Sequence, residues 1–251
     1  MQPTGVLDTA KATNPLKDLL KFGQSVWLDY IRRDLLTSGE LKRLIAEDGL
    51  RGMTSNPTIF EKAITGGTLY DDLLTSLRPR TDLDAKGRYE ILAIRDIQDA
   101  ADVFRPVYES SKRHDGYVSL EVSPYLARDT KGTIDEARRL WKSVQRENVM
   151  IKIPGTVEGI PAFQQAISEG INVNVTLLFA RDAYEAVAHA YIEGLEARKS
   201  AGQPLAHVAS VASFFVSRID TVVDSLIDEK LKTAAGADKV RLERLAGKVW
   251  R

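Results

Sequence analysis

The chain has 251 residues, of which 43% are hydrophobic and 28% charged, and its formal net charge at neutral pH is zero. A chain of this length can bury one large core, and its balanced charge offers no basic surface for nucleic acid or an anionic membrane. It contains no cysteine, which excludes disulfides, thiolate catalysis and cysteine metal sites. Phosphorylated small molecules remain as ligands, because a few arginines suffice to bind them.

Signals for metal binding, secretion and membrane insertion are also missing from the sequence. His114, His189 and His207 are the only histidines, and they lie far apart with no metal-ligand spacing. The amino terminus lacks a basic segment followed by an apolar one, and no apolar stretch approaches the length of a transmembrane helix. We therefore expect a cytoplasmic protein with no metal, no nucleic acid partner and no membrane partner.

Short apolar runs alternate with helical patterns along the chain. The apolar runs predict strands at 25–31, 49–55, 117–122, 149–153, 171–179 and 207–216. Helical periodicity predicts helices at 15–22, 38–47, 57–78, 82–113, 133–145, 158–169, 181–201, 218–234 and 238–249. Gly66-Gly67 interrupts the third helix, Ser38 and Thr133 are the expected N-caps, and Glu136 follows Thr133 at capping-box spacing.

Strands that alternate with helices indicate parallel pairing through right-handed crossovers. Two α/β architectures fit this pattern: a TIM-type (β/α)8 barrel and a doubly wound sheet. No G-x-G-x-x-G sequence follows the first strand, so the dinucleotide-binding form of the doubly wound sheet loses support.

Lys152 is the single cation in the apolar run 149–153, which Pro154-Gly155 terminates. Such a run is typical of a strand that is buried on both faces, and burial disfavours a charged ammonium. A neutral lysine amine is a nucleophile that forms a Schiff base with a carbonyl compound. The simpler interpretations are a head group that extends past the strand end into water and a head group that pairs with a carboxylate.

Polar residues lie within or just after each predicted strand, where a (β/α)8 barrel carries its working side chains. They are Asp29, Asn56, Glu121, Lys152, Asn174, Thr176 and Ser213. Several have simpler interpretations, since Asp29 suits a helix cap, Asn56 a turn before Pro57, and Thr176 any strand. Glu121 is the least ordinary, because a carboxylate in a buried strand must be paired or protonated.

A lysine with carboxylates, amides and hydroxyls on one rim predicts an aldolase-type site. Lys152 attacks a ketone to form an iminium, and Asp29 exchanges the proton of the neighbouring hydroxyl when the carbon–carbon bond breaks. Glu121 handles protons through a water that Thr176 helps to position.

The remaining polar residues suit substrate binding. Asn56 and Asn174 would hold substrate hydroxyls or the enamine. Ser213 and Arg218, at the end of the sixth strand and the start of a helix, would bind a phosphate. The simpler interpretation of Arg218 is a surface salt bridge, with Asp220 or a neighbour as its partner.

Six segments of the chain resemble the transaldolase family, in the same order. They are LD at 28–29, TSNP at 54–57, VSLEV at 118–122, MIKIP at 150–154, INVNVTLLF at 171–179 and SFFVSR at 213–218. The resemblance covers nearly the whole chain, and its long amino-terminal helices are similar to those of the larger transaldolases, including fusions to glucose-6-phosphate isomerase. It implies a (β/α)8 barrel without a metal or organic cofactor.

The family reaction that the resemblance implies belongs to the pentose phosphate pathway. A dihydroxyacetone unit passes from sedoheptulose 7-phosphate to glyceraldehyde 3-phosphate, which gives erythrose 4-phosphate and fructose 6-phosphate. The family's catalytic residues fall on Lys152, Asp29, Glu121 and Thr176. Its substrate-binding residues fall on Thr54, Asn56, Asn174, Ser213, Phe215 and Arg218.

The family closes its barrel with eight strands, whereas this sequence predicts six. We therefore expect a single domain over 1–251 that is truncated after about six β/α units. The open edge would be left by truncation, covered by a homodimer, or part of a shortened barrel that is active or inactive. We expect weak or absent activity unless that edge is covered.

Two other functions compete with a transferase. Fructose 6-phosphate aldolases share the scaffold but carry glutamine at the position of Glu121 and tyrosine at that of Phe215, so both residues favour a transferase. The other alternative is an inactive fragment that acts only as an interaction domain. Retention of Lys152, Asp29 and Glu121 argues against a long-standing loss of catalysis.

Overall fold

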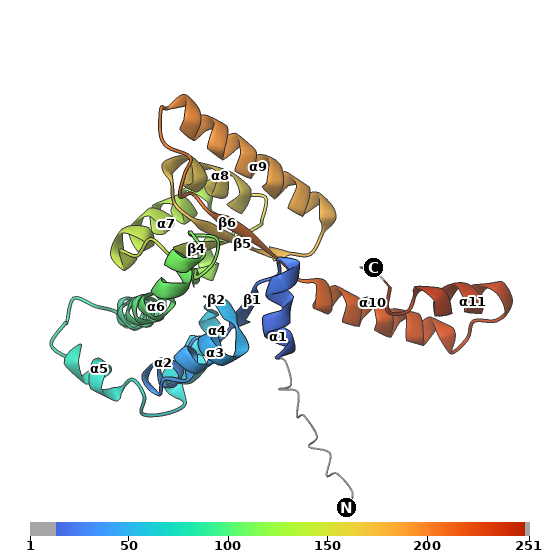
Figure 1. Cartoon of the computed structure of the whole chain (residues 1–251), viewed down its shortest axis with the longest axis horizontal. Helices are drawn as coiled ribbons and strands as arrows, with labels where there is room; N and C mark the ends of the chain where they lie inside the picture. The colour runs from blue at the N-terminus through green and yellow to red at the C-terminus, as the bar shows by residue number, and fades with distance from the viewer. Residues whose placement is uncertain (1–13, 249–251) are drawn as a thin grey trace, which may run out of the picture. The chain divides into compact units, whose positions relative to one another are not determined.

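The computed structural model describes residues 14–248 of the chain (Figure 1). These residues divide into two compact units. Unit 1 consists of 14–121 and 138–151, and unit 2 consists of 122–137 and 152–248. The single domain expected over 1–251 stays a prediction.

All the predicted strands are confirmed within one or a few residues. They are β1 (Val26–Asp29), β2 (Leu50–Thr54), β3 (Val118–Glu121), β4 (Val149–Pro154), β5 (Val173–Leu178) and β6 (Ser210–Phe214). Hydrogen-bonded neighbours follow the chain order β1-β2-β3-β4-β5-β6, and the β1–β2, β2–β3 and β5–β6 pairs are parallel. A doubly wound sheet reverses its strand order at one point. Strict chain order therefore excludes that alternative and is the connectivity of a TIM-type barrel, with six β/α units in residues 14–248.

The helices expected from periodicity are also confirmed. They are α1 (Pro15–Asp18), η1 (Leu19–Phe22), α2 (Arg33–Thr37), α3 (Glu40–Asp48), α4 (Pro57–Thr65), α5 (Asp71–Ser76), α6 (Ala85–Ser110), η2 (Pro124–Leu126), α7 (Thr130–Val144), α8 (Gly159–Glu169), α9 (Arg181–Ser200), α10 (Val216–Leu231) and α11 (Gly236–Leu245). The sequence did not predict α2 and η2, because helices this short show no period. Within the described residues, no helix is both long and apolar enough to cross a membrane.

The predicted cap of α3 is wrong. Gly39, at a φ of 83°, is the N-cap residue, and it offers no side chain. Ser38 lies one residue too early, and its Oγ only accepts a 3.3 Å hydrogen bond from the Glu40 N–H. A glycine reaches this left-handed conformation without the steric penalty that a serine would meet.

The predicted cap of α7 is also wrong, because the helix begins at Thr130. Asp129 Oδ1 accepts a 2.9 Å hydrogen bond from the Gly132 N–H, as an N-cap side chain does. Thr133 Oγ1 instead donates to the Leu126 carbonyl at 3.0 Å. Glu136 Oε2 accepts from the Ser123 N–H at 2.5 Å, so these two residues anchor the segment that follows β3.

The core of unit 1 lies between its strands and the long helix α6. α6 packs against β2 and β3, and it buries Leu92, Ile97 and Phe104 at helical spacing. Gly52 on β2 lies under the Trp27 ring of β1, where an added Cβ would come within 2.3 Å of the ring. Only a glycine therefore lets the tryptophan cover this strand.

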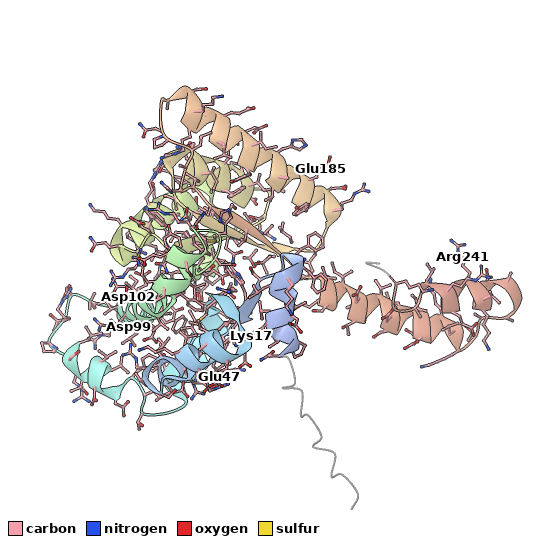
Figure 2. All side chains as sticks on the ribbon, viewed as in Figure 1. Lys17, Glu47, Asp99, Asp102, Glu185 and Arg241 are labelled. Atoms are coloured by element: carbon pink, nitrogen blue, oxygen red, sulfur yellow. The ribbon has the colours of Figure 1, made fainter. Side chains whose placement is uncertain are left out.

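The amino-terminal helix of unit 1 is tied to α3. Asn14 caps α1 through a 2.9 Å hydrogen bond from the Leu16 N–H, and its Nδ2 donates to Glu47 O at 3.0 Å and to Asp48 Oδ1 at 2.7 Å. Figure 2 labels Lys17 on α1 and Glu47 on α3. The Asn14 side chain thus caps the start of α1 and donates hydrogen bonds to the carboxyl-terminal end of α3.

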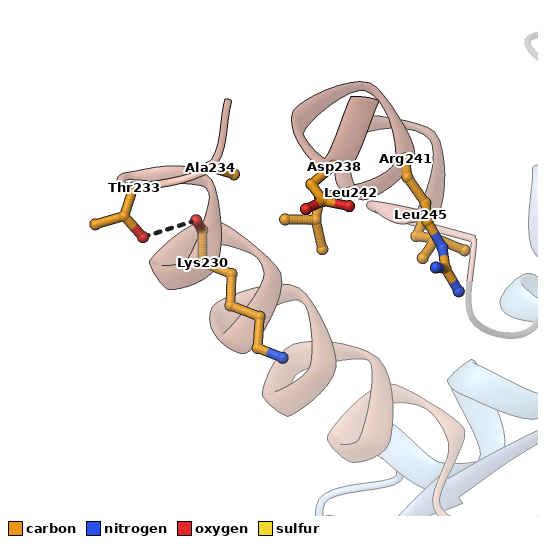
Figure 3. A pocket seen from close by; sticks show the side chains of 7 residues that line it. All are labelled: Lys230, Thr233, Ala234, Asp238, Arg241, Leu242 and Leu245. Atoms are coloured by element: carbon orange, nitrogen blue, oxygen red, sulfur yellow. Dashed lines mark hydrogen bonds between the residues drawn. The ribbon is translucent and has the colours of Figure 1, made fainter. Parts of the chain in front are cut away.

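In unit 2, α8 and α9 lie side by side (Figure 1). A Cβ on Gly194 would meet the Gln164 carbonyl at 2.8 Å, so a glycine is what allows this close approach. α10 and α11 pack together, and a cavity of about 480 Å³ lies at their contact (Figure 3). Its lining is Lys230, Thr233, Ala234, Asp238, Arg241, Leu242 and Leu245, and none of these is a residue that the sequence predicted as functional.

Candidate active site

Asp29 and Thr54 are brought together in unit 1. The register of the parallel strands sets Asp29 beside Thr54, and Thr54 beside Ser119. Thr54 Oγ1 donates a 2.5 Å hydrogen bond to Asp29 Oδ1. Because Arg32 is the N-cap residue of α2, the helix-cap interpretation of Asp29 is wrong, and its exposed carboxylate stands at the carboxyl end of β1.

Asn56 lies two residues after the end of β2, where it caps α4. Its Oδ1 accepts a 3.0 Å hydrogen bond from the Thr58 N–H, and Pro57 occupies the first helical position. The simpler interpretation, an ordinary turn before proline, is therefore wrong, because Asn56 is the N-cap residue of a helix. Since Oδ1 serves the helix, any contact with a substrate would fall to the Nδ2 donor.

Glu121 is the last residue of β3 and is half-buried. Burial, together with the negative charge of Glu121, raises the pKa of Tyr89 to about 12. The Tyr89 ring on α6 meets Phe60 edge-on at a centroid distance of 6.1 Å. No sequence signal marked Tyr89, because an aromatic residue on an amphipathic helix is normally a packing residue.

Lys152 lies in the middle of β4, and every residue of that strand is buried. Lys152 itself is 6% exposed, so a head group that extends into water is excluded. Its carbonyl accepts a 3.1 Å hydrogen bond from the Val122 N–H. The prediction of a lysine inside an apolar strand that is buried on both faces is confirmed.

A backbone hydrogen bond at the end of β4 indicates its register against β5. Gly155 N–H donates to the Thr176 carbonyl at 2.7 Å. In a parallel ladder this bond places Pro154 beside Thr176, and therefore Lys152 beside Asn174. Adjacent residues of a ladder project on the same face of the sheet, and Asn174 and Thr176 are both buried. The amine, the amide and the hydroxyl thus share one face of unit 2.

Ser213 on β6 extends this polar face. Its Oγ donates a 2.8 Å hydrogen bond to Asn174 Oδ1. A serine has one O–H to donate, so the proton that a phosphate would need is engaged by the asparagine in this structure.

Arg218 lies in the first turn of α10, and Phe215 is the N-cap residue of that helix. Its guanidinium carbon is 4.7 Å from the centroid of the Phe215 ring. Phe215 in turn stacks on Phe179, with centroids 4.9 Å apart and planes 8° apart. Among residues 14–248 no ion pair joins Arg218 to Asp220, so the salt-bridge interpretation is wrong. Phe179 follows β5 and ends the segment 171–179 that resembles the family, but no local pattern indicated a role for it.

The two units therefore hold different parts of the predicted set. Unit 1 joins Asp29 to Thr54 and carries Asn56 and Glu121 at the ends of its strands. Unit 2 assembles a polar face and an aromatic–cation stack, whose members are Lys152, Asn174, Thr176, Ser213, Phe215 and Arg218. In the described part of the chain, no three His, Cys, Asp or Glu side chains converge as a metal site would require.

The arrangement in unit 2 suits covalent carbonyl chemistry. An amine held within an apolar strand is a nucleophile toward a ketone. The neighbouring amide and hydroxyls can orient polar substrate groups, and an exposed guanidinium can bind an anion.

Known proteins match the chain over most of its length. The family model for transaldolase/fructose-6-phosphate aldolase matches residues 26–247. Over 239 residues the chain is 52% identical to a transaldolase of Trichodesmium erythraeum, an alignment that covers 94% of this chain and 62% of that protein.

Two further relatives give the same picture. A protein named transaldolase 2 from Nostoc punctiforme is 49% identical over 94% of this chain and 65% of its own length. A transaldolase of Thiobacillus denitrificans is 52% identical over 84% of this chain and 59% of its own length. The chain thus spans about 60% of the length of the curated relatives it matches. It belongs to the transaldolase/fructose-6-phosphate aldolase family.

Proposed function

We propose that the chain is a transaldolase, a transferase that moves a dihydroxyacetone unit from sedoheptulose 7-phosphate to glyceraldehyde 3-phosphate. The products are erythrose 4-phosphate and fructose 6-phosphate, and the reaction belongs to the pentose phosphate pathway. The observation that carries the proposal is Lys152, a buried amine beside Asn174 on a polar face of unit 2.

Lys152 begins the reaction as its nucleophile. Its amine attacks the ketone carbon of the donor sugar to give a carbinolamine, and loss of water gives an iminium. Asp29 takes the proton of the hydroxyl on the leaving-group carbon of the scissile bond, and this carbon becomes the aldehyde of the departing aldose. The electrons of that bond flow into the iminium, and an enamine of dihydroxyacetone stays on Lys152 while the shortened aldose leaves.

The same groups act in reverse when the acceptor aldehyde arrives. The enamine carbon attacks the aldehyde, and Asp29 returns its proton to the new hydroxyl. Glu121, with a water that Thr176 helps to hold, transfers protons in the dehydration and hydrolysis of the carbinolamine. A site built in this way keeps the three-carbon unit covalently bound between the two half-reactions.

The remaining residues bind the substrate. Asn174 and Asn56 offer Nδ2 donors to hydroxyls, and Thr54 orients Asp29 through their hydrogen bond. Arg218 takes the phosphate of the sugar. Ser213 must turn its O–H from Asn174 toward that phosphate, because it has only one proton to donate.

The rival reaction on this scaffold releases free dihydroxyacetone. Glu121 and Phe215 favour the transferase, since fructose 6-phosphate aldolases carry glutamine and tyrosine there. An inactive interaction domain is the remaining alternative, and the intact Lys152, Asp29 and Glu121 argue against it.

We also propose sugar phosphates as the small-molecule partners and the cytoplasm as the location. β1 and β6 end the strand order, and a homodimer that covers an open edge would support activity. A monomer with the turnover of a full-length relative would contradict that requirement, and sedimentation together with an assay measures both.

Borohydride trapping with fructose 6-phosphate tests the reaction directly. Reduction of the Schiff base should leave a dihydroxyacetone adduct on Lys152, which peptide mass analysis locates. Lys152→Ala should abolish the adduct. Lys131→Ala, at a lysine whose side chain is 88% exposed, should leave it unchanged. A folded protein that yields no adduct on Lys152 contradicts the proposal.

The acceptor separates the transferase from the aldolase. With glyceraldehyde 3-phosphate present, a transaldolase consumes donor and forms a new sugar phosphate. Without an acceptor, a transaldolase stalls after one turnover, whereas an aldolase continues to release dihydroxyacetone. Sustained release of dihydroxyacetone would favour the aldolase.

A further inference from the structure

We propose that Phe179 is a positioning residue of this site, which holds the Arg218 guanidinium in place through Phe215 so that it can bind a phosphate group. The inference rests on the phosphate-binding role that the proposed function gives to Arg218. It adds a residue that no motif singled out.

The three side chains form a continuous stack. The Arg218 guanidinium carbon is 4.7 Å from the Phe215 centroid, a distance at which a cation is attracted to the face of a ring. Phe179 lies on Phe215 at 4.9 Å and 8°, so Phe215 is supported by a second, nearly parallel ring. Without that support, Phe215 would have room to turn, and Arg218 would lose the surface on which it rests.

Burial does not explain why Phe179 is there. Its side chain is 45% exposed, and a phenylalanine that served the core would be largely buried. The neighbouring residue of β6, Phe214, makes the packing contact, because it meets Tyr184 of α9 edge-on at 6.0 Å. Phe214, the last residue of β6, thus packs against the helix, whereas Phe179 and Phe215, which follow β5 and β6, stack beneath Arg218.

A β-bulge brings Phe179 into line with Phe215. Val175 pairs with Ala212, but Leu178 pairs with Phe214, so β5 uses three residues where β6 uses two. Without the extra residue, Leu178 would lie beside Phe215 and Phe179 would lie beside Val216. With it, Phe179 follows Leu178 as Phe215 follows Phe214, and the Phe215 N–H donates to the Leu178 carbonyl at 2.9 Å.

The residue that makes this shift is strained. Leu177 has a φ of 62°, which a bulky side chain rarely adopts. Its side chain is 46% exposed and is not part of the core. Strained residues and bulges often occur where a functional side chain must be redirected, and here the redirected side chain is Phe179.

Titration with inorganic phosphate tests the stack, with the Arg218 Nε–H resonance as the reporter. Phe179→Ala should weaken phosphate affinity by about 3- to 10-fold, the range expected when a partly exposed cation loses its aromatic support. Phe179→Tyr, which keeps the ring, should restore it to within about twofold. Phe179→Leu keeps an apolar side chain without a flat face, so it tests the stack even if the alanine variant fails to fold.

A matched control comes from the aromatic residue that contacts Phe214. The side chain of Tyr184 is 46% exposed, nearly the same fraction as that of Phe179. Its ring contacts Phe214 and not Phe215. Tyr184→Ala should leave phosphate affinity unchanged. Equal phosphate affinity in the wild type and in Phe179→Leu would overturn the inference, and so would wild-type protein whose Arg218 resonance does not respond to phosphate.

Phosphate-free dihydroxyacetone separates this inference from the proposed function. Trapping of dihydroxyacetone on Lys152 needs no phosphate contact, so Phe179→Leu should trap it as the wild type does. If the wild type trapped no dihydroxyacetone on Lys152, the proposed reaction would be contradicted. Normal trapping with unaltered phosphate affinity in Phe179→Leu would contradict only the role of Phe179.

Discussion

Arg33 and Arg218 both lie over aromatic rings, and they differ in what else they contact. In unit 1, Arg33 is 5.2 Å from the centroid of Tyr70 and also forms an ion pair with Asp96, which is completely buried. The Tyr70 hydroxyl donates to the other oxygen of Asp96 at 2.7 Å. In unit 2, Arg218 lies over Phe215, and no carboxylate among residues 14–248 is paired with it.

The difference separates a charge that stabilises the fold from a charge that can bind a ligand. Burial raises the pKa of Asp96 against the opposing effect of its hydrogen bonds to Tyr70 and Arg33. Burial, and the hydrogen bond to Asp96, raise the pKa of Tyr70. A buried network of this kind is stable only when every member is present. Arg218 is exposed and has no such partner, so an incoming anion does not have to displace a carboxylate.

Asp96→Ala should cause the largest loss of unfolding free energy. Removing the carboxylate leaves the Arg33 charge without its partner in a largely buried place, which costs roughly 3–5 kcal/mol of unfolding free energy. Urea denaturation measures this loss. Asp99→Ala is the matched control, because Asp99 lies one turn further along α6 in a partly exposed ion pair with Arg95, and it should change stability by less than about 1 kcal/mol. Similar losses in the two variants would mean that Asp96 is not the centre of a closed network.

Tyr70→Phe should cause a smaller loss of unfolding free energy. The substitution keeps the ring beneath Arg33 but removes the hydroxyl that donates to Asp96. A buried acceptor that loses its donor costs about 1–3 kcal/mol. The same denaturation experiment measures it, and Tyr125→Phe, at a residue that is almost fully exposed, should have no effect. Wild-type stability in Tyr70→Phe would show that water or another donor replaces the hydroxyl.

The exposed ion pair between Asp102 and Arg146 should contribute less to the free energy of unfolding, and it should do so only above acidic pH. Arg146 donates to both Asp102 oxygens, at 2.6 and 2.9 Å, and these hydrogen bonds lower the pKa of Asp102. A carboxyl whose pKa is lowered by folding stabilises the protein above its ordinary pKa of about 4 and loses this contribution as the pH falls through the folded value.

The test is to compare Asp102→Asn with the wild type in urea at pH 7 and at about pH 2.5, where the carboxyl of the unfolded chain is protonated. The variant should be less stable by no more than about 1 kcal/mol at pH 7, and the difference should shrink in acid. Figure 2 labels Asp102 beside Asp99 on α6. A difference that grows in acid would reverse the predicted sign.

The smallest effect on stability should come from Arg218→Ala. Its charge is exposed and rests only on a ring, so its loss should change the unfolding free energy by about 0.5 kcal/mol or less. The phosphate response described above should nevertheless disappear. A loss of stability comparable to that of Asp96→Ala would place Arg218 with Arg33 as a structural arginine and remove the contrast between the two.

The sequence predicted the strands and the position of Lys152 more reliably than the partners of individual side chains. Apolar runs and periodicity located every strand, because these signals depend on residues close together in the chain. The same reasoning misplaced the caps at Ser38 and Thr133, since a cap depends on backbone geometry that a preference for serine or threonine does not determine. It also gave Arg218 a carboxylate partner among its alternatives, where the structure has an aromatic ring.

What the sequence determined by itself is the alternation of strands and helices, the burial of Lys152, and the polar residues at the strand ends. Only the tertiary structure decided which atoms meet. Ser213 reaches Asn174 across 39 residues of chain, and Phe179 meets Phe215 because one additional residue shifts the register of β5. No local pattern announces a leucine at a φ of 62°. Its strained conformation is held by the pairing on either side of it, and that pairing exists only once the sheet has formed.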